Sequence, residues 1–211
     1  MSEDIEMPLL SGNEAKKKFP YEGDPLQNFE DPHLYELFRF CQLEEFVISD
    51  IKDQIEKVYL NKSPLYSIAD EVDLNGMNLL HVLLSNGTDE EFFVKNLNKT
   101  ARKAVVEIFK LIYDQVSLHK FQQMVVQKDN NERTPLHYAS LVDDDNDEDE
   151  ESGISLFLSD HGANLCLFQK DGNAKAPLEY ISTFHLEKHL NSLCIIRRED
   201  QKAITNIKMF R

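Results

Sequence analysis

The chain has 211 residues, of which 41% are hydrophobic, and it carries a formal net charge of −15 at pH 7. This length and apolar content suit one domain with a single extended core, and seven glycines without any tryptophan are not typical of a barrel or a nucleotide-binding sheet. The strong acidity disfavours nucleic acid as a partner, because phosphates and carboxylates repel one another.

Residues 1–30 are polar and contain prolines and glycines that interrupt regular structure, so we expect a flexible N-terminal arm. From Asp31 the pattern becomes helical, because Asp31 can cap a helix that starts with Pro32, and apolar residues then recur on one face. A second helix is predicted near residues 43–60. We expect residues 31–70 to form a helical cap over one end of the fold.

Three later stretches begin with the same phrase, at Asp73, Asp129 and Asp171. In each, an aspartate precedes a turn, and a short apolar helix opens after the turn. The middle copy continues as Thr134-Pro135-Leu136-His137. Here the threonine can cap the helix with its hydroxyl, and the proline suits the first helical position, where no backbone donor is needed. Leu136 and Ala139 should then face the core.

The sequence Thr134-Pro135-Leu136-His137 resembles the helix-opening signature of ankyrin repeats. His161-Gly162-Ala163-Asn164 resembles the close of such a repeat, where glycine supplies a turn with positive φ. Residues 129–164 therefore look like one whole repeat. The first copy has Asn78-Leu79 where the signature has Thr-Pro, and the third copy departs further.

The resemblance implies an all-α ankyrin-repeat solenoid over residues 71–196, with repeats that start near residues 73, 129 and 171. Residues 31–70 would then be the N-terminal helical cap, or a degenerate repeat that lacks its hairpin. His81 and His137 would have a structural role rather than a catalytic or metal-binding one, because histidine belongs to the fixed pattern of the family. His137 could hydrogen-bond to a neighbouring repeat.

The repeat starts lie farther apart than the family period of about 33 residues, so both intervals should contain insertions. In the first interval, apolar residues recur at helical spacing between Thr100 and Val116. We expect inserted or lengthened helices over residues 90–126, with an aliphatic stripe that belongs to the core rather than to a cofactor site.

The second interval contains an acidic run that cannot be buried, because its charges repel one another. We expect this run to be a disordered loop. Two interpretations stay open, namely a solvated loop that maintains solubility and an acidic hook that attracts a partner with a basic surface. A calcium loop fits poorly, because Glu148 stands where the turn of such a loop needs glycine. The run consists of Asp143, Asp144, Asp145, Asp147, Glu148, Asp149, Glu150 and Glu151.

The C-terminal part is predicted to form a helix near residues 184–196, followed by a basic tail over residues 197–211. His185 and His189 lie one helical turn apart, which is a spacing that zinc sites use. We find no further ligand that would complete such a site in the sequence, so we expect no metal.

The cysteines suit reduced thiols in the cytosol or nucleus, because they are odd in number and lack close pairing. The sequence also lacks a recognisable signal peptide and a membrane-length apolar run, so we expect a cytoplasmic or nuclear protein without membrane insertion. For a protein of a pathogen, the compartment would be the host-cell cytosol. The three cysteines are Cys41, Cys166 and Cys194.

We recognise no phosphate loop or nucleophile elbow, and we expect a protein that is not an enzyme, without catalytic residues, cofactor or small-molecule substrate. The ankyrin resemblance implies a protein–protein interaction module that binds through hairpin tips and inner helices. The loose consensus favours a host-directed effector of an intracellular bacterium or virus, on the analogy of fold alone. The alternative is an enzyme or enzyme-regulatory subunit with a site in the inserted helices, residues 90–126.

We expect the partner contacts at the hairpin tips, because tips can vary without a packing cost. Met77 and Arg133 are the predicted anchors, because a thioether and a guanidinium make large and adaptable contacts. The full predicted set is Asn75, Met77, Glu132, Arg133, Asn173 and Lys175.

Overall fold

The computed structural model describes residues 23–43, 47–60, 62, 66–85, 95, 97–142 and 153–180. Over these ranges the chain is helical and contains no strand, which confirms the all-α prediction. The helices are α1 (Pro32–Gln42), α2 (Ile48–Leu60), η1 (Ile68–Asp70), α3 (Leu79–Leu84), α4 (Lys99–Gln115), α5 (Leu118–Val126), α6 (Pro135–Val142), α7 (Ile154–Asp160), η3 (Ala163–Cys166) and η4 (Pro177–Glu179).

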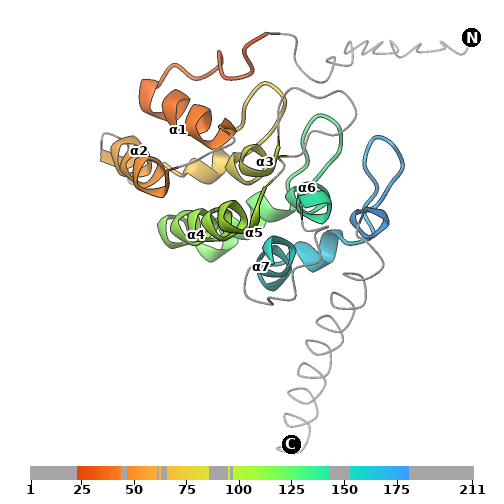
Figure 1. The fold of residues 1–211 in the computed structure, drawn as a ribbon. Helices are drawn as coiled ribbons and strands as arrows, with labels where there is room; N and C mark the ends of the chain where they lie inside the picture. Colours follow the sequence, from red (N-terminus) through yellow and green to blue (C-terminus); the bar gives the residue numbers. More distant parts are fainter. Residues whose placement is uncertain are drawn as a thin grey trace, which may run out of the picture.

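The helices lie in three rows (Figure 1). In the first row α1 packs against α3, α3 against α6, and α6 against the short helix η4. In the second row α4 lies between α2 and α7, and in the third row α5 contacts both η1 and η3. The chain therefore passes through the three rows in the same order each time. We call each such passage a unit, and the described units are α1-α2-η1, α3-α4-α5 and α6-α7-η3, followed by η4.

A row of turns runs beside the first row of helices, over residues 24–29, 73–78, 129–134 and 171–176. Figure 1 shows the last three as loops that project on the same side of the helices. One backbone hydrogen bond joins each turn to the next, at 2.9 Å in every case. The three bonds run from the N–H of Leu74 to the carbonyl of Pro25, from Asn130 to Asn75, and from Gly172 to Asn131.

The turn at residues 24–29 corrects the expectation that the flexible arm extends to residue 30, and the expectation that a degenerate repeat at residues 31–70 would lack its hairpin. Residues 23–30 do not belong to a flexible arm, because Leu26 is 1% exposed and Pro25 accepts a hydrogen bond from the next turn. The helix pair α1 and α2 is therefore preceded by a turn of its own. The turn was missed because its spacing differs from that of the three repeated phrases, although Asp24 caps it by accepting the N–H of Leu26 at 2.9 Å.

Helix α1 begins where the sequence predicts. The Asp31 carboxylate accepts the N–H groups of His33 and Leu34, and proline follows the cap directly. The second helix is shorter than the predicted range 43–60, because Leu43 has an extended backbone and α2 starts at Ile48.

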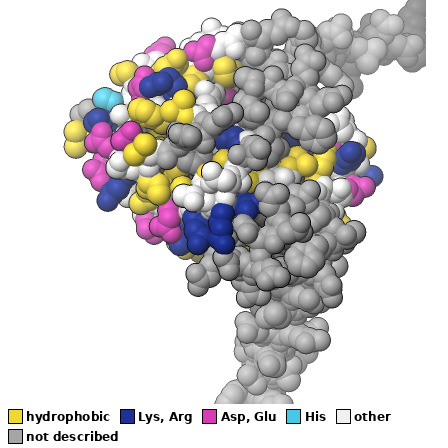
Figure 2. All heavy atoms as spheres, in the orientation of Figure 1, with side chains coloured by type: hydrophobic (Ala, Val, Ile, Leu, Met, Phe, Trp, Pro, Cys, Tyr) yellow, Lys and Arg dark blue, Asp and Glu magenta, His cyan; other side chains and the backbone are white. Residues whose placement is uncertain are grey.

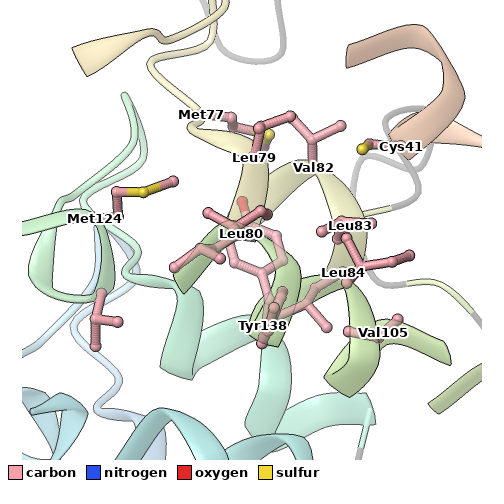
Figure 3. Close-up of a cluster of buried hydrophobic side chains, with 14 of the residues drawn as sticks. Cys41, Met77, Leu79, Leu80, Val82, Leu83, Leu84, Val105, Met124 and Tyr138 are labelled. Atoms are coloured by element: carbon pink, nitrogen blue, oxygen red, sulfur yellow. The ribbon is translucent and has the colours of Figure 1, made fainter. Parts of the chain in front are cut away.

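Helix α3 is buried on every side, so it lies at the centre of the core (Figure 3). Tyr138 from α6 and Val105 from α4 pack around its leucines. Leu136 and Ala139 are fully buried as predicted. The core thus continues from one first-row helix to the next.

Helices α4 and α5 lie within the range 90–126, and their interpretation as inserted or lengthened helices stays a prediction. Helix α4 packs between α2 and α7, so it is the second-row member of its unit, and α5 holds the corresponding place in the third row. The aliphatic stripe of α4 belongs to the core, as expected. Its buried apolar members are Val105, Val106, Ile108, Phe109 and Ile112.

Candidate functional site

The three repeated aspartates fold their turns in the same way. In each, the Oδ1 atom accepts the backbone N–H groups two and four residues later, and the aspartate N–H donates to the carbonyl four residues later. Such side-chain bonds to the backbone are why aspartate favours turns. The donors are Asn75 and Met77 for Asp73, Asn131 and Arg133 for Asp129, and Asn173 and Lys175 for Asp171, at 2.8–3.0 Å.

Gly76 shows how closely neighbouring turns approach. Its φ is +74°, and a Cβ atom at this position would lie 2.8 Å from the Oδ1 atom of Asn130 in the next turn. Asn130 also donates its side-chain N–H to the carbonyl of Leu74 at 2.9 Å. Glycine leaves room for this close approach, and it adopts the positive φ with less strain than Glu132 and Ala174, which hold the corresponding positions of the later turns.

His81 bridges helix α3 to the following turn, and His137 bridges helix α6 to the segment just before the last described turn. The Nε2 atom of His81 lies 3.1 Å from the Arg133 carbonyl, and that of His137 lies 3.1 Å from the Gln169 carbonyl. The Nδ1 atom of His137 accepts the Thr134 N–H at 3.0 Å, so the ring proton is on Nε2. The predicted bond from His137 to a neighbouring repeat stays a prediction, because Gln169 precedes the turn at residues 171–176.

Burial keeps both imidazoles neutral. It lowers the pKa of His81 and of His137 to about 4, against a usual value of 6.5. Both rings are occupied by bonds within the fold, which supports the structural interpretation of the two histidines.

A buried ionic network joins the last two turns. The Arg133 Nε atom donates to Asp171 Oδ2 at 3.1 Å, and its guanidinium lies 5.8 Å from the centre of the Tyr138 ring. Burial alone would raise the pKa of Asp171, but hydrogen bonds from Tyr180, from the Lys175 backbone and from Arg133 outweigh it and lower that pKa. The charge on Asp171 is thus compensated inside the fold.

The two predicted anchors are not exposed. Met77 is 3% exposed and Arg133 is 4% exposed, and Asn75, another predicted contact, is 5% exposed. The reason is the row itself, because each turn covers the inward side chains of the turn before it. Asn173 and Lys175 hold the corresponding positions in the last described turn, where both are exposed.

Glu132 is exposed as predicted, and its backbone has a positive φ of 59°. Two further side chains on the same side were not predicted, Gln27 and Asn28, because their turn lacks the repeated phrase. The signal that could have found the turn is Asp24 followed by Tyr35, whose hydroxyl donates to that aspartate at 3.2 Å. We call Gln27, Asn28, Glu132, Asn173 and Lys175 the turn-row surface.

The turn-row surface is polar and mixed in charge, so it can make non-covalent contacts with another molecule. Glu132 lies 3.9 Å from the Lys128 ammonium, and Lys175 has the opposite charge. Figure 2 shows acidic and basic side chains interspersed on the face that it draws.

Several predicted features lie outside the described residues, namely the acidic run 143–151, the helix near 184–196 with His185 and His189, and the basic tail. In the described ranges no three histidine, cysteine, aspartate or glutamate side chains gather as metal ligands would. No helix in those ranges has the length and apolarity needed to cross a membrane. Cys41 and Cys166 are buried free thiols, and burial raises the pKa of Cys41 to about 12.

Comparisons with protein-family models, with curated proteins and with solved structures found no match to this chain.

Proposed function

We propose that this chain is a divergent ankyrin-like repeat protein that binds another protein through its turn-row surface and has no enzymatic activity. The observation that carries the proposal is the row of turns, in which neighbouring turns are joined by equivalent backbone hydrogen bonds. Units that contact only their neighbours are the mark of repeat proteins, and such proteins use extended surfaces for binding.

The use of polar residues within the fold supports a binding role. The residues with catalytic potential in the turns are occupied by structural bonds, since the aspartates hold backbone N–H groups and the histidines join separate segments. Asn28 also donates to the Val72 carbonyl at 2.9 Å, whereas Glu132, Asn173 and Lys175 extend their side chains from exposed positions. These three can change with little cost to packing, as a surface that selects partners requires.

The proposed partner is a protein with a basic surface. The net charge of −15 supports this choice, because a strongly acidic chain attracts basic partners and repels acidic ones. The acidic run 143–151 follows directly after α6 and would add to this attraction if it lies near the binding surface. The compartment proposed for the encounter is the cytosol or nucleus, of a host cell if the protein comes from a pathogen.

The experiment is capture of partner proteins from a eukaryotic cell lysate, followed by measurement of affinity for the purified partner. A triple variant, Glu132→Ala, Asn173→Ala and Lys175→Ala, should weaken binding by roughly 1–3 kcal/mol. The matched control is Glu107→Ala with Lys110→Ala, an exposed pair on α4 that should leave binding unchanged.

The outcomes separate the surfaces. If the triple variant binds as well as the unchanged chain, the turn-row surface is not the site. If binding instead fails when the acids of residues 143–151 are replaced by Asn and Gln, recognition runs through the acidic run. If the α4 control alone abolishes binding, the second row of helices is the site.

A further inference from the structure

The three aspartate turns differ at the second carboxylate oxygen, Oδ2. The Tyr138 hydroxyl donates to Asp129 Oδ2 at 2.5 Å, and the Tyr180 hydroxyl donates to Asp171 Oδ2 at 2.7 Å. Each tyrosine stands nine residues after its aspartate. The corresponding position after the first aspartate is Val82, which has no hydroxyl to donate.

The turns also differ in positive charge. Arg133 is bonded to Asp171, and its charge also favours the ionised form of Asp129, although burial outweighs this effect and raises the pKa of Asp129. The corresponding residue of the first turn is Met77, which is buried and uncharged. Asp73 therefore lacks both the tyrosine hydroxyl and the guanidinium that the last aspartate receives.

Asp73 is nonetheless buried, with 4% of its surface exposed. The charge of Asp129 in the next turn acts against its ionisation as well. Burial is the larger cause, and together they raise the pKa of Asp73 to about 7 despite the N–H groups that it accepts. The titratable groups on the two turns bonded to its own turn, and on α3, are Asp24 from the preceding turn, His81 from α3, and Asp129, Glu132 and Arg133 from the following turn, with Lys128 and Glu30 beside those turns in the sequence.

We propose that the Asp73 carboxyl group is a proton-operated switch in the turn row, because it is buried without the tyrosine hydroxyl and the guanidinium that hold the aspartate of the last turn. Ionisation places a charge between α3 and two turns, where no described tyrosine or arginine is bonded to it. The carbonyl of Asn75, two residues along, receives the Asn130 N–H that joins the two turns. Loss of the proton should therefore loosen the contact between the first and second aspartate turns.

The direction of the pH effect follows from proton linkage. The folded chain binds a proton at Asp73 between pH 3.8 and about 7, whereas the unfolded chain does not. The stabilisation from this proton is complete below pH 3.8 and is lost as the pH rises through about 7. The switch is independent of which partner the turn-row surface binds.

The test measures the Asp73 carboxyl directly, by carbon-13 NMR of the full chain over a pH titration. The proposal predicts a midpoint near pH 7 for Asp73. The amide signals of Asn75 and Met77 should move with the same midpoint, because both N–H groups donate to this carboxylate. A midpoint at or below the ordinary value of 3.8 would overturn the proposal.

A second measurement uses Asp73→Asn, which keeps an oxygen for the two N–H groups and cannot ionise. Relative to the unchanged chain, its folding equilibrium constant should rise by about tenfold per pH unit across the interval below pH 7 and level off above it. The matched control is Asp171→Asn. The pKa of Asp171 is lowered, so this variant should differ from the unchanged chain by a constant factor over the same interval.

The carbon-13 titration and the pH dependence of Asp73→Asn together decide whether Asp73 acts as a switch. A constant ratio for Asp73→Asn over the interval in which the control is also constant would contradict the switch. If the variant fails to fold, the carbon-13 midpoint of the unchanged chain still decides.

Discussion

The Nε2 atom of His137 lies 3.1 Å from the carbonyl oxygen of Gln169, so one imidazole joins helix α6 to the segment just before the turn at residues 171–176. Because Nδ1 of the same ring accepts the Thr134 N–H, both ring nitrogens are committed. The histidine of the repeated phrase therefore holds together two segments that lie far apart in the sequence.

Replacing His137 by Ala should therefore destabilise the chain. The change leaves the Thr134 N–H and the Gln169 carbonyl without their partner, at a cost of roughly 1–3 kcal/mol. Urea unfolding followed by circular dichroism measures the loss. The control is His119→Ala, an exposed histidine on α5, and an equal loss in both variants would contradict the bridging role.

The stability of the chain should also carry a histidine-dependent pH signature. The pKa values of His81 and His137 are lowered by burial to about 4, so below pH 6.5 the unfolded chain takes up protons that the folded chain refuses. Their contribution to stability is lost as the pH falls from 6.5 to about 4, by about tenfold in the folding constant per pH unit and per histidine. Asp73 acts in the opposite direction, so the comparison requires a variant.

The double variant His81→Gln with His137→Gln isolates the histidine contribution. The difference in unfolding free energy between this variant and the unchanged chain should shrink as the pH falls through that window. A difference that is the same at both ends of the window would show that the two imidazoles titrate normally in the folded chain.

Because α6 lies between α3 and η4, we expect two leucines at corresponding positions to contribute unequally to the free energy of unfolding. Leu136 is fully buried between units, and Leu136→Ala should cost roughly 2–5 kcal/mol. Leu178, at the corresponding place in the last described unit, is only partly buried, so Leu178→Ala should cost less. Thermal unfolding of the two variants compares them, and equal shifts in Tm would argue against the placement of α6 at the centre.

The buried pair of Arg133 and Asp171 predicts that arginine serves the fold rather than a partner. The two side chains are 5% and 0% exposed, so Arg133→Ala leaves an unpaired buried carboxylate and should cost about 3–5 kcal/mol. The double variant Arg133→Met with Asp171→Asn removes both charges and should recover most of that loss. A single variant as stable as the unchanged chain would restore Arg133 as a candidate contact residue.

The sequence was sufficient to predict features that depend on local chemistry. Asp31-Pro32 starts α1, Pro135 starts α6, and Leu136 enters the core, because caps, prolines and helical periodicity act within one segment. The repeated aspartates also predicted turns at the right places.

Features that depend on the packing of neighbouring units could not be predicted from the pattern of one segment. Met77 and Lys175 hold corresponding positions in their turns, yet one is buried under the next turn and the other is exposed. The irregular spacing of the repeated phrases predicts extra or lengthened helix before Asp129, but it does not predict that α4 packs between α2 and α7. Exposure and row membership belong to the arrangement of units, which a single segment does not encode.

The hydrogen bonds between neighbouring turns are the basis of the repeat-protein account, and amide hydrogen exchange of the full chain tests them most directly. The account predicts that the N–H groups of Leu74, Asn130 and Gly172 are protected, because each donates to a carbonyl of the preceding turn. Exchange of these three amides at the rates of an unstructured peptide, in a chain whose α3 and α6 amides remain protected, would contradict it.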